Sequence, residues 1–247
     1  MLTKLNYPIE NFSPEKNISQ MFGCNGEYYF KNFGSPGHQG VDLVVRGDRN
    51  GFGSPILAAH DGIVSKVVWD DFPLHTRGNG IYVNTLDGKY ATVYWHLATI
   101  EVAIGQKISD GDKIGTLGNT GRVYPLPTKN NLWAGSHLHF AVYEYGKQND
   151  YNGFVDPIPF LFTPGDKLPV TFPVDMYLDY SGDFVSWLQT ALRLEGLAHD
   201  YDPIGYYGMK TKRDVSTLQR NNEINPIFGY CGRQTRELLN KKYSSFY

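Results

Sequence analysis

The chain has 247 residues, of which 41% are hydrophobic and 15% aromatic, and its formal net charge is −2. This length and composition can supply one large domain, or a medium domain followed by a small one, and they exclude a disordered chain. The near-neutral charge argues against nucleic acid or an anionic lipid surface as a main partner. The two cysteines, Cys24 and Cys231, form no Cys-x-x-Cys pair, so a metal site is expected to use His and Asp, and no disulfide framework is expected.

The N-terminal segment, MLTKLNYPIENFSPEKN, has no apolar stretch like that of a secretory signal, which spans roughly 7–15 residues. No segment approaches the roughly 18 consecutive apolar residues of a membrane helix. We therefore expect no membrane insertion. We also expect either a trimmed N-terminus or a route out of the cytoplasm that uses no signal peptide.

The first histidine motif is His38-Gln39-Gly40-Val41-Asp42. Its glycine, with Gly37 beside it, argues against a helix. In an extended strand His38 and Asp42 would lie about 13 Å apart, so binding one ion together requires a bend. Gly40 could supply the bend through backbone dihedrals that are closed to other residues. Taken alone, an Asp after a turn is equally well explained as a capping group.

Residues from about 50 to 145 predict β-strands, because they are rich in Val, Ile, Tyr and Thr and are interrupted by glycines. Asp87-Gly88, between two alternating segments, predicts a two-residue hairpin turn of type I′. In the second arm of this hairpin, strand alternation places His96 at the end of the more polar face and Trp95 on the opposite face.

The second histidine motif is Tyr94-Trp95-His96-Leu97, and the third is His137-Leu138-His139-Phe140. Residues i and i+2 of a strand project from one face about 6.5–7 Å apart. That separation is too wide for both imidazoles to bind one small ion. It suits one histidine on the metal and the other facing the substrate or its water. Taken alone, two histidines on a solvated strand face are an equally good explanation.

Residues 157–181 interrupt the regular pattern and are predicted to include a linker that partly docks on the first domain. The residues that break it are Pro157, Pro159, Pro164, Gly165, Pro169 and Pro173. Helical spacing follows in the stretches GDFVSWLQTALRLEGL, MKTKRDVSTLQRNNEI and GRQTRELLNKKY. The apolar positions expected to face inward are Phe184, Leu188, Ala191 and Leu192, then Val215 and Leu218, then Leu238 and Leu239.

Together the motifs predict one zinc ion. His38, Asp42 and one of the pair His137 and His139 would give two imidazoles and one carboxylate. Three protein ligands and an open fourth position are typical of a catalytic zinc site, whereas a structural site uses four. The remaining histidine of the pair and His96 would then be available to handle protons.

Residues from about 34 to 160 resemble the lysostaphin/LytM-type zinc endopeptidases of peptidoglycan. The resemblance rests on the collinear stretches HQGVD, SPILAAHDGIV, GNGIYV, YWHL, GDKIGTLGNTG and SHLHFAVYE, followed by Val155-Asp156-Pro157. It implies that His38, Asp42 and His139 hold the zinc ion. It also implies that His137 is the general base and that His96 stabilises the oxyanion, although these two roles could be exchanged.

Residues from about 182 to 240 resemble the three-helix peptidoglycan-binding domain often attached to wall hydrolases, on GDFVSWLQTALRLEG, YYGMKTKRDVSTLQRNN and FGYCGRQTRELL. The two resemblances predict an α+β multidomain fold. Its catalytic domain (residues 1–165) would be a mainly antiparallel β-sheet of the duplicated hybrid motif type. A linker (166–181) and a three-helix peptidoglycan-binding domain (182–247) would follow.

Candidate substrate contacts surround the expected centre. The segment 122–136 is an apparently enlarged loop that carries Tyr124 and Trp133. It is predicted to form a wall of the substrate groove, with a passive insertion as the equal alternative. Asn79 could orient a substrate or satisfy a turn. The phenols of Tyr28 and Tyr29 could reach the oxyanion, with packing as their alternative role.

Other histidines and tyrosines are assigned smaller parts. Catalytic roles are not expected for His60, His75 and His199. Four tyrosines of the small domain could either contact sugars or stem peptides or lie in the core, namely Tyr201, Tyr206, Tyr207 and Tyr230.

The predicted function is zinc-dependent hydrolysis of peptide bonds in peptidoglycan stem peptides or cross-bridges. The alternatives are a non-catalytic wall-binding or regulatory protein that retains a metal pocket, and a zinc amidase that cuts the sugar–peptide junction, which the motif order disfavours. The expected partner is bacterial peptidoglycan, met by a monomer at the cell wall, outside the cell or in the periplasm. A phage lysin released through a membrane lesion and a bacterial autolysin both fit, and no motif specifies the bond that is cut.

Overall fold

The structure is a computed structural model that describes residues 4–70, 77–162, 165–198 and 205–246. The chain divides into two compact units, one of Met1–Gln20 and Gln39–Pro157 and one of Met21–His38 and Ile158–Tyr247. The predicted domain limits at residues 165 and 181 stay a prediction. Among the described residues, no helix has the length and apolar character needed to cross a membrane.

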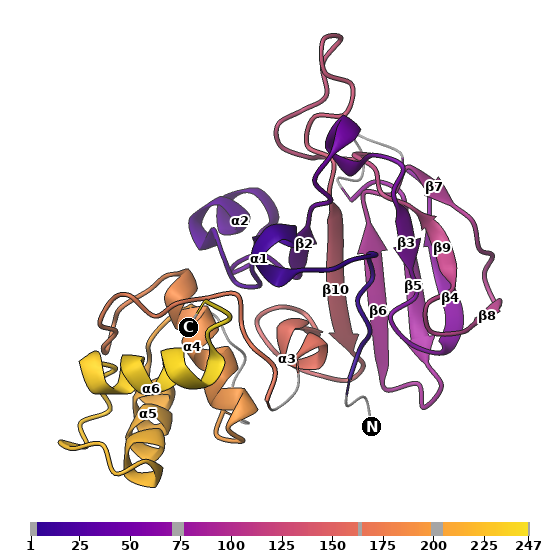
Figure 1. The fold of residues 1–247 in the computed structure, drawn as a ribbon. Coiled ribbons are helices and arrows are strands. Elements are labelled where there is room, and N and C mark those ends of the chain that lie inside the picture. Colours follow the sequence, from indigo (N-terminus) through magenta and orange to yellow (C-terminus); the bar gives the residue numbers. More distant parts are fainter. Residues whose placement is uncertain (1–3, 71–76, 163–164, 199–204, 247) are drawn as a thin grey trace. The chain divides into compact units, whose positions relative to one another are not determined.

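The first unit is built on an eight-stranded sheet whose neighbouring strands are all antiparallel (Figure 1). The strand order is β1-β2-β10-β6-β5-β4-β8, and β11 also pairs with β10. The strands are β1 (Ile18–Gln20), β2 (Val41–Leu43), β4 (Gly62–Val68), β5 (Gly80–Thr85), β6 (Tyr90–Trp95), β8 (Lys107–Ile108), β10 (Leu138–Glu144) and β11 (Phe154–Val155). Because β10 lies between β2 and β6, the three histidine motifs meet on adjacent strands.

A smaller antiparallel sheet completes the first unit. Its order is β3 (Pro55–Leu57), β9 (Lys113–Thr116) and β7 (Thr99–Ile100). A short helix α1 (Pro14–Asn17) precedes β1, and a 3-10 turn η1 (Asp48–Gly51) follows β2. Both sheets supply fully buried apolar side chains, among them Val41, Leu43, Ile56, Ile81, Val93, Ile114 and Phe140. The predicted mainly antiparallel β fold is confirmed.

The hairpin between β5 and β6 is confirmed, but its predicted turn type is wrong. A type I′ turn needs a positive φ at both central residues, and within the predicted pair only Gly88 has one, at 66°. The Asp87 carboxylate accepts hydrogen bonds from the Thr85 hydroxyl (2.6 Å) and the Lys89 N–H (3.0 Å). This side chain therefore holds a longer loop of residues 86–89 in place of the two-residue turn.

The second unit contains α2 (Gly26–Phe33), α3 (Ile158–Leu161), α4 (Asp183–Leu194), α5 (Met209–Asn221) and α6 (Arg233–Tyr243). The three helices predicted from the apolar spacing are α4, α5 and α6. Most of the expected inward positions are buried, namely Leu188, Ala191, Leu192, Val215, Leu218 and Leu239, while Phe184 and Leu238 are half-buried. The α+β fold class is confirmed.

Two equivalent turns organise this unit. The sequence Gly-Tyr-x-Gly-x-x-Thr occurs at 205–211, where it leads into α5, and again at 229–235, where it leads into α6. The Gln189 amide N–H groups donate to the Tyr206 carbonyl oxygen and the Thr211 hydroxyl (both 2.9 Å), and its oxygen accepts from the Gly205 N–H (3.1 Å). One buried glutamine on the preceding helix therefore fixes the first turn.

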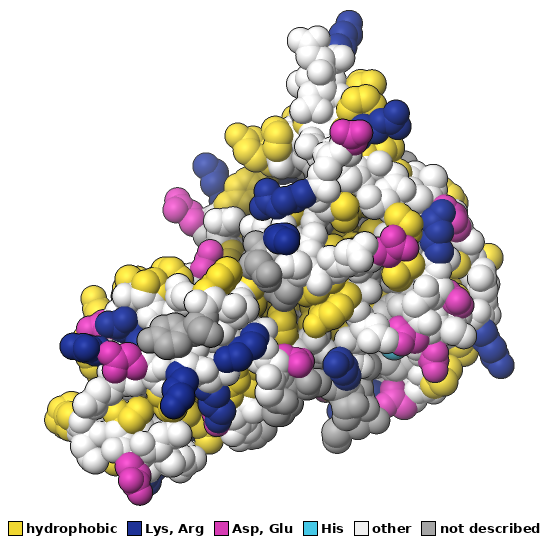
Figure 2. Space-filling model, in the orientation of Figure 1, with side chains coloured by type: hydrophobic (Ala, Val, Ile, Leu, Met, Phe, Trp, Pro, Cys, Tyr) yellow, Lys and Arg dark blue, Asp and Glu magenta, His cyan; other side chains and the backbone are white. Residues whose placement is uncertain are grey.

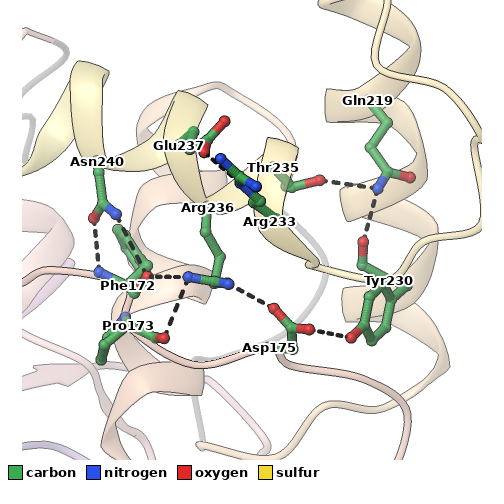
Figure 3. A network of polar contacts seen from close by, with 10 residues as sticks. All are labelled: Phe172, Pro173, Asp175, Gln219, Tyr230, Arg233, Thr235, Arg236, Glu237 and Asn240. Atoms are coloured by element: carbon green, nitrogen blue, oxygen red, sulfur yellow. Dashed lines mark hydrogen bonds and ion pairs between the residues drawn. The ribbon is translucent and has the colours of Figure 1, made fainter.

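Gln219 makes the same three bonds in the second turn, and Figure 3 shows those to Tyr230 and Thr235. Its amide N–H groups donate to the Tyr230 carbonyl oxygen (2.8 Å) and the Thr235 hydroxyl (3.0 Å), and its oxygen accepts from the Gly229 N–H (3.0 Å). Residues 176–179, which precede α4, contact both turns. Met176 pairs with Cys231, and the Asp179 N–H donates to the Tyr207 carbonyl oxygen. The second unit thus contains the same glutamine-held turn twice.

Candidate metal centre

Three side chains converge at the edge where β2 and β10 pair. Asp42 and His139 are register partners on these antiparallel strands, and His38 comes just before β2. The three side chains are buried and offer ligand atoms that all lie within 4.8 Å of one another. At zinc–ligand distances of about 2.0–2.2 Å, two tetrahedral ligands stand about 3.3 Å apart. His139 Nδ1 and Asp42 Oδ1 lie 3.1 Å apart, so the donor set fits zinc.

Gly40 allows this convergence by a different means from the one predicted. Its backbone does not adopt the left-handed conformation that a glycine-specific bend would show. A Cβ at this position would lie 2.5 Å from the Phe140 carbonyl oxygen and 2.8 Å from His139 Nε2. Gly40 is therefore needed because the chain passes tightly against β10 and the His139 ring.

The His38 ring is oriented by the backbone that precedes it. Its Nδ1 lies 3.1 Å from the Met21 carbonyl oxygen, and a carbonyl can only accept, so Nδ1 carries the hydrogen. Nε2 is then the nitrogen that could bind a metal, as is usual when a backbone carbonyl fixes the tautomer of a ligand. Tyr29 is half-buried against the same ring, with centroids 5.3 Å apart. Its predicted contact with substrate stays a prediction.

The two remaining histidines of the motifs stand beside this cluster. Their rings lie 4.6 Å apart, and His137 Nε2 is 3.7 Å from Asp42 Oδ1. His137 Nδ1 donates to the Gly135 carbonyl oxygen (2.7 Å) and His96 Nδ1 to the Thr120 carbonyl oxygen (2.8 Å). In its neutral form each ring would therefore present an Nε2 lone pair. Burial, followed by the neighbouring His137 and His139, holds the pKa of His96 well below its usual range.

The predicted strand face of His96 is wrong. β6 ends at Trp95, and His96 has a positive φ of 66°. This left-handed backbone, which His adopts more often than most residues, breaks the strand alternation. The Trp95 and His96 rings consequently both face His139, with centroids at 4.9 Å and 6.2 Å.

Asn79 braces loops near the centre. Its side-chain oxygen accepts from the Asp70 N–H (2.8 Å), and its amide donates to the Leu97 carbonyl oxygen (3.0 Å). Its own N–H donates to the Thr120 hydroxyl (2.9 Å), next to the carbonyl that holds His96. These bonds give it a structural part, and the predicted orientation of substrate stays a prediction.

The loop of residues 122–136 projects from one end of the sheet and carries hydrophobic and basic side chains (Figures 1 and 2). Tyr124 is 92% exposed at its start. Trp133, near its other end, lies under the Arg49 guanidinium, 5.2 Å from the ring centroid, and its carbonyl accepts from the Asn50 side chain (3.1 Å). The sequence does not predict the Arg49 and Asn50 contacts, because they depend on the positive φ of these two residues in η1.

The histidines not expected to be catalytic are only partly described. His60 Nδ1 donates to the Asp61 carbonyl oxygen (2.7 Å), and its Nε2 lies 3.0 Å from the Thr92 hydroxyl. Burial lowers the pKa of His60. Tyr207 is fully buried, whereas Tyr206 and Tyr230 are about two-fifths exposed. The remaining residues of this group, His75, His199 and Tyr201, lie outside the described residues.

The chain is similar to curated proteins of bacterial origin. It is 37% identical over 103 residues to peptidoglycan DD-endopeptidase ShyC of Vibrio cholerae, which is 42% of this chain and 19% of that protein. It is 30% identical over 230 residues to glycyl-glycine endopeptidase ALE-1 of Staphylococcus capitis, or 78% of this chain and 58% of that protein. The chain thus spans less than two thirds of either relative. A structure of lysostaphin from Staphylococcus simulans matches 60% of this chain and 50% of its own, at 24% identity and a TM-score of 0.45.

Residues 36–151 match the family model of peptidase family M23. This range contains the three histidine motifs, the strands that carry them and the projecting loop. It agrees with the resemblance seen in the sequence, which is confirmed. The chain therefore contains a peptidase family M23 domain at residues 36–151.

Proposed function

We propose that the protein is a zinc-dependent endopeptidase that hydrolyses peptide bonds in the stem peptides or cross-bridges of bacterial peptidoglycan. The observation that carries this proposal is the buried group His38, Asp42 and His139. His137 Nε2 stands 3.7 Å from the Asp42 carboxylate beside it. The M23 match over residues 36–151 supports the reaction class. The names of the two relatives, a peptidoglycan DD-endopeptidase and a glycyl-glycine endopeptidase, support the substrate class.

His38, Asp42 and His139 would hold one zinc ion as two imidazoles and one carboxylate, which leaves a position open. A zinc ion bound there would polarise the scissile carbonyl and lower the pKa of a water molecule toward about 7. The Met21 carbonyl keeps His38 Nε2 available for the ion. The Asp42 carboxylate also lies within reach of His137, so metal binding and proton handling share one side chain.

His137 and His96 handle the proton and the developing charge. Because each Nδ1–H donates to a backbone carbonyl, each neutral ring can accept a proton only at Nε2. In our assignment His137 accepts the proton of the attacking water and later gives it to the leaving amine. His96 stabilises the oxyanion once its Nε2 has taken up a proton that it can donate, a contribution commonly worth about 2.7–4 kcal/mol. The two roles can be exchanged without changing the reaction.

The loop of residues 122–136 would form one wall of the substrate groove. Its Tyr124 side chain is 92% exposed, and Arg49 and Asn50 anchor the Trp133 end. Asn119 also ties this end down, since its amide donates to the Leu132 and Ala134 carbonyl oxygens (2.9 and 3.0 Å). A loop that is anchored at its base and exposes the Tyr124 ring is suited to contact an extended peptide.

The three-helix part of the chain would hold the enzyme on its insoluble substrate. Each of its equivalent turns presents a partly exposed tyrosine whose hydroxyl donates to an aspartate, Tyr206 to Asp179 and Tyr230 to Asp175. Aromatic faces beside hydrogen-bonding groups suit sugar rings and peptides. Attachment of this kind raises the local concentration of the catalytic site. The protein would act as a monomer at the cell wall, either as a phage lysin or as a bacterial autolysin.

Mass spectrometry of purified peptidoglycan after digestion tests the proposal. The expected result is a set of new peptide amines that a zinc chelator abolishes and that His137→Ala does not produce. The masses of these fragments identify the bond. An intact peptidoglycan that nevertheless retains the protein would contradict the proposed reaction and favour a non-catalytic wall-binding protein.

A further inference from the structure

A row of side chains crosses three adjacent strands at the metal centre. Asp42 on β2 is the register partner of His139 on β10, and His139 is the register partner of Trp95 on β6. Directly opposite residues in antiparallel strands point to the same face of a sheet. The Trp95 indole accordingly stacks on the His139 imidazole, with centroids 4.9 Å apart and planes 19° apart.

The indole is enclosed on its other sides. The Arg77 guanidinium lies 4.5 Å from the Trp95 ring centroid. Tyr82 and Phe154 meet the indole edge-on, at 6.1 Å and 5.9 Å. A Cβ at Gly80, on the next strand, would lie 2.3 Å from Trp95 Cδ1. The indole is only 4% exposed, so it is held firmly against His139.

We propose that Trp95 is a positioning residue that fixes the plane of the His139 imidazole for zinc, and that Arg77 and Gly80 hold Trp95 in place. The inference rests on the zinc site of the proposed function. Ligand histidines are usually oriented by a hydrogen bond from the ring nitrogen that does not bind the metal. His38 has such a partner in the Met21 carbonyl, and in His139 the nitrogen that faces Asp42 and would bind the metal is Nδ1. The stacked indole supplies an orientation that does not depend on the other ligand.

The proposal predicts that Trp95 sets zinc affinity. Outer-sphere changes at metal sites typically cost about 10–100-fold in affinity. Trp95→Leu is therefore expected to raise the zinc dissociation constant by about this factor, measured by competition with a chromophoric chelator. Trp95→Phe keeps an aromatic face and is expected to recover most of the affinity. The visible absorption of the Co²⁺-loaded protein is expected to change in Trp95→Leu and to return toward the parent spectrum in Trp95→Phe.

A matched control separates this effect from general loss of packing. Trp133 also lies beside an arginine guanidinium, but it belongs to the projecting loop. Trp133→Leu is expected to leave the zinc dissociation constant unchanged. Thermal unfolding of each variant in chelator reports whether the metal-free protein is folded.

The exposed Arg77 provides a second test if Trp95→Leu does not fold. Arg77→Leu removes a cation–π contact at an exposed site, and the zinc dissociation constant is expected to rise about two- to fivefold. Unchanged zinc affinity in folded Trp95→Leu, or in Arg77→Leu where Trp95→Leu is unfolded, overturns the inference. Equal losses in Trp133→Leu and Trp95→Leu overturn it as well. A parent protein that binds zinc through His38, Asp42 and His139 but cuts no peptidoglycan would contradict the proposed function alone.

Discussion

His139 Nδ1 lies 3.1 Å from Asp42 Oδ1, and the two residues are direct register partners on β10 and β2. This pairing places a carboxylate and an imidazole side by side although 97 positions separate them in sequence. Two features complete the arrangement: His38 comes from the segment that precedes β2, and Gly40 lets that segment pass close to His139. The site is therefore a product of strand pairing.

Replacing Asp42 with Asn is expected to lower zinc affinity by more than about 100-fold, because loss of a charged ligand exceeds the cost of an outer-sphere change. The amide keeps the size of the side chain, so the metal-free protein should remain folded. Isothermal titration with zinc measures the effect. Asp87→Asn, in the β5–β6 hairpin, is the control and should bind zinc like the parent. Tight zinc binding by Asp42→Asn would contradict the ligand assignment.

His137→Ala and His96→Ala are each expected to reduce peptide-bond cleavage by about 10²–10⁴-fold, the range for loss of general acid–base or oxyanion assistance. Both variants should still bind one zinc ion, since neither histidine is a proposed ligand. Amine release from peptidoglycan and metal analysis measure the two properties on the same samples. If a variant no longer bound zinc, the replaced histidine would be a zinc ligand, which would contradict its assigned role.

Gly40→Ala should weaken both the fold and the site. The new Cβ would meet the Phe140 carbonyl oxygen at 2.5 Å, a backbone atom that cannot move without disturbing β10. Overpacking of this kind typically costs about 1–3 kcal/mol. Urea denaturation in the presence of a chelator measures the free energy of unfolding. A zinc titration measures the affinity, which should fall if the new Cβ displaces His139. An alanine variant equal to the parent in both would remove the close-approach explanation.

The pKa of His60 predicts a pH dependence of stability. Burial lowers this pKa below its ordinary value of 6.5, against the raising effects of the Asp61 carbonyl and of the Asp110, Asp61 and Asp87 charges. The folded protein therefore resists protonation that the unfolded chain accepts. His60 destabilises the fold progressively as the pH falls from 6.5 toward the lowered folded pKa.

Urea denaturation in chelator from pH 7.5 down to 5 checks this prediction, with His60→Gln as the comparison. The unfolding free energy of the parent should fall more steeply than that of the variant below pH 6.5. Parallel pH profiles would show that His60 does not contribute to the acid sensitivity.

Gln219→Ala is expected to destabilise the second unit by about 2–4 kcal/mol, because it leaves buried backbone groups without hydrogen bonds (Figure 3). Gln189→Ala should cost a similar amount, since it makes the same three bonds in the other turn. The exposed Gln234→Ala serves as a control. Thermal unfolding measures stability, and zinc affinity should not change. A small loss at Gln219 beside a large one at Gln189 would contradict their equivalence.

The sequence predicted those parts of the site that local motifs carry. His38, Asp42 and His139 come together as predicted, and His96 and His137 stand beside them. The role of Trp95 could not be predicted, because it depends on which residue of β10 faces β6. The face of His96 was predicted wrongly because strand alternation assumes ordinary backbone angles, and a φ of 66° reverses it.

The fold shows the same division between local and long-range information. Apolar spacing predicted α4, α5 and α6, because each helix buries one face. The type of the β5–β6 turn was wrong since the Asp87 side chain holds a longer loop. The repeated Gly-Tyr-x-Gly-x-x-Thr motif is local in the sequence, but no local pattern shows what holds it. Its meaning becomes clear only from the glutamines of the preceding helices, 16 and 10 residues before the turns they hold.

The most direct test of the account is to measure the release of new peptide amines from purified peptidoglycan as zinc is added back to the chelated protein. The account predicts that cleavage rises with zinc and levels off at one ion per chain, and that His139→Ala shows no cleavage at any of these additions. Cleavage that persists in the fully chelated protein, or no cleavage at one bound zinc ion per chain, would contradict it.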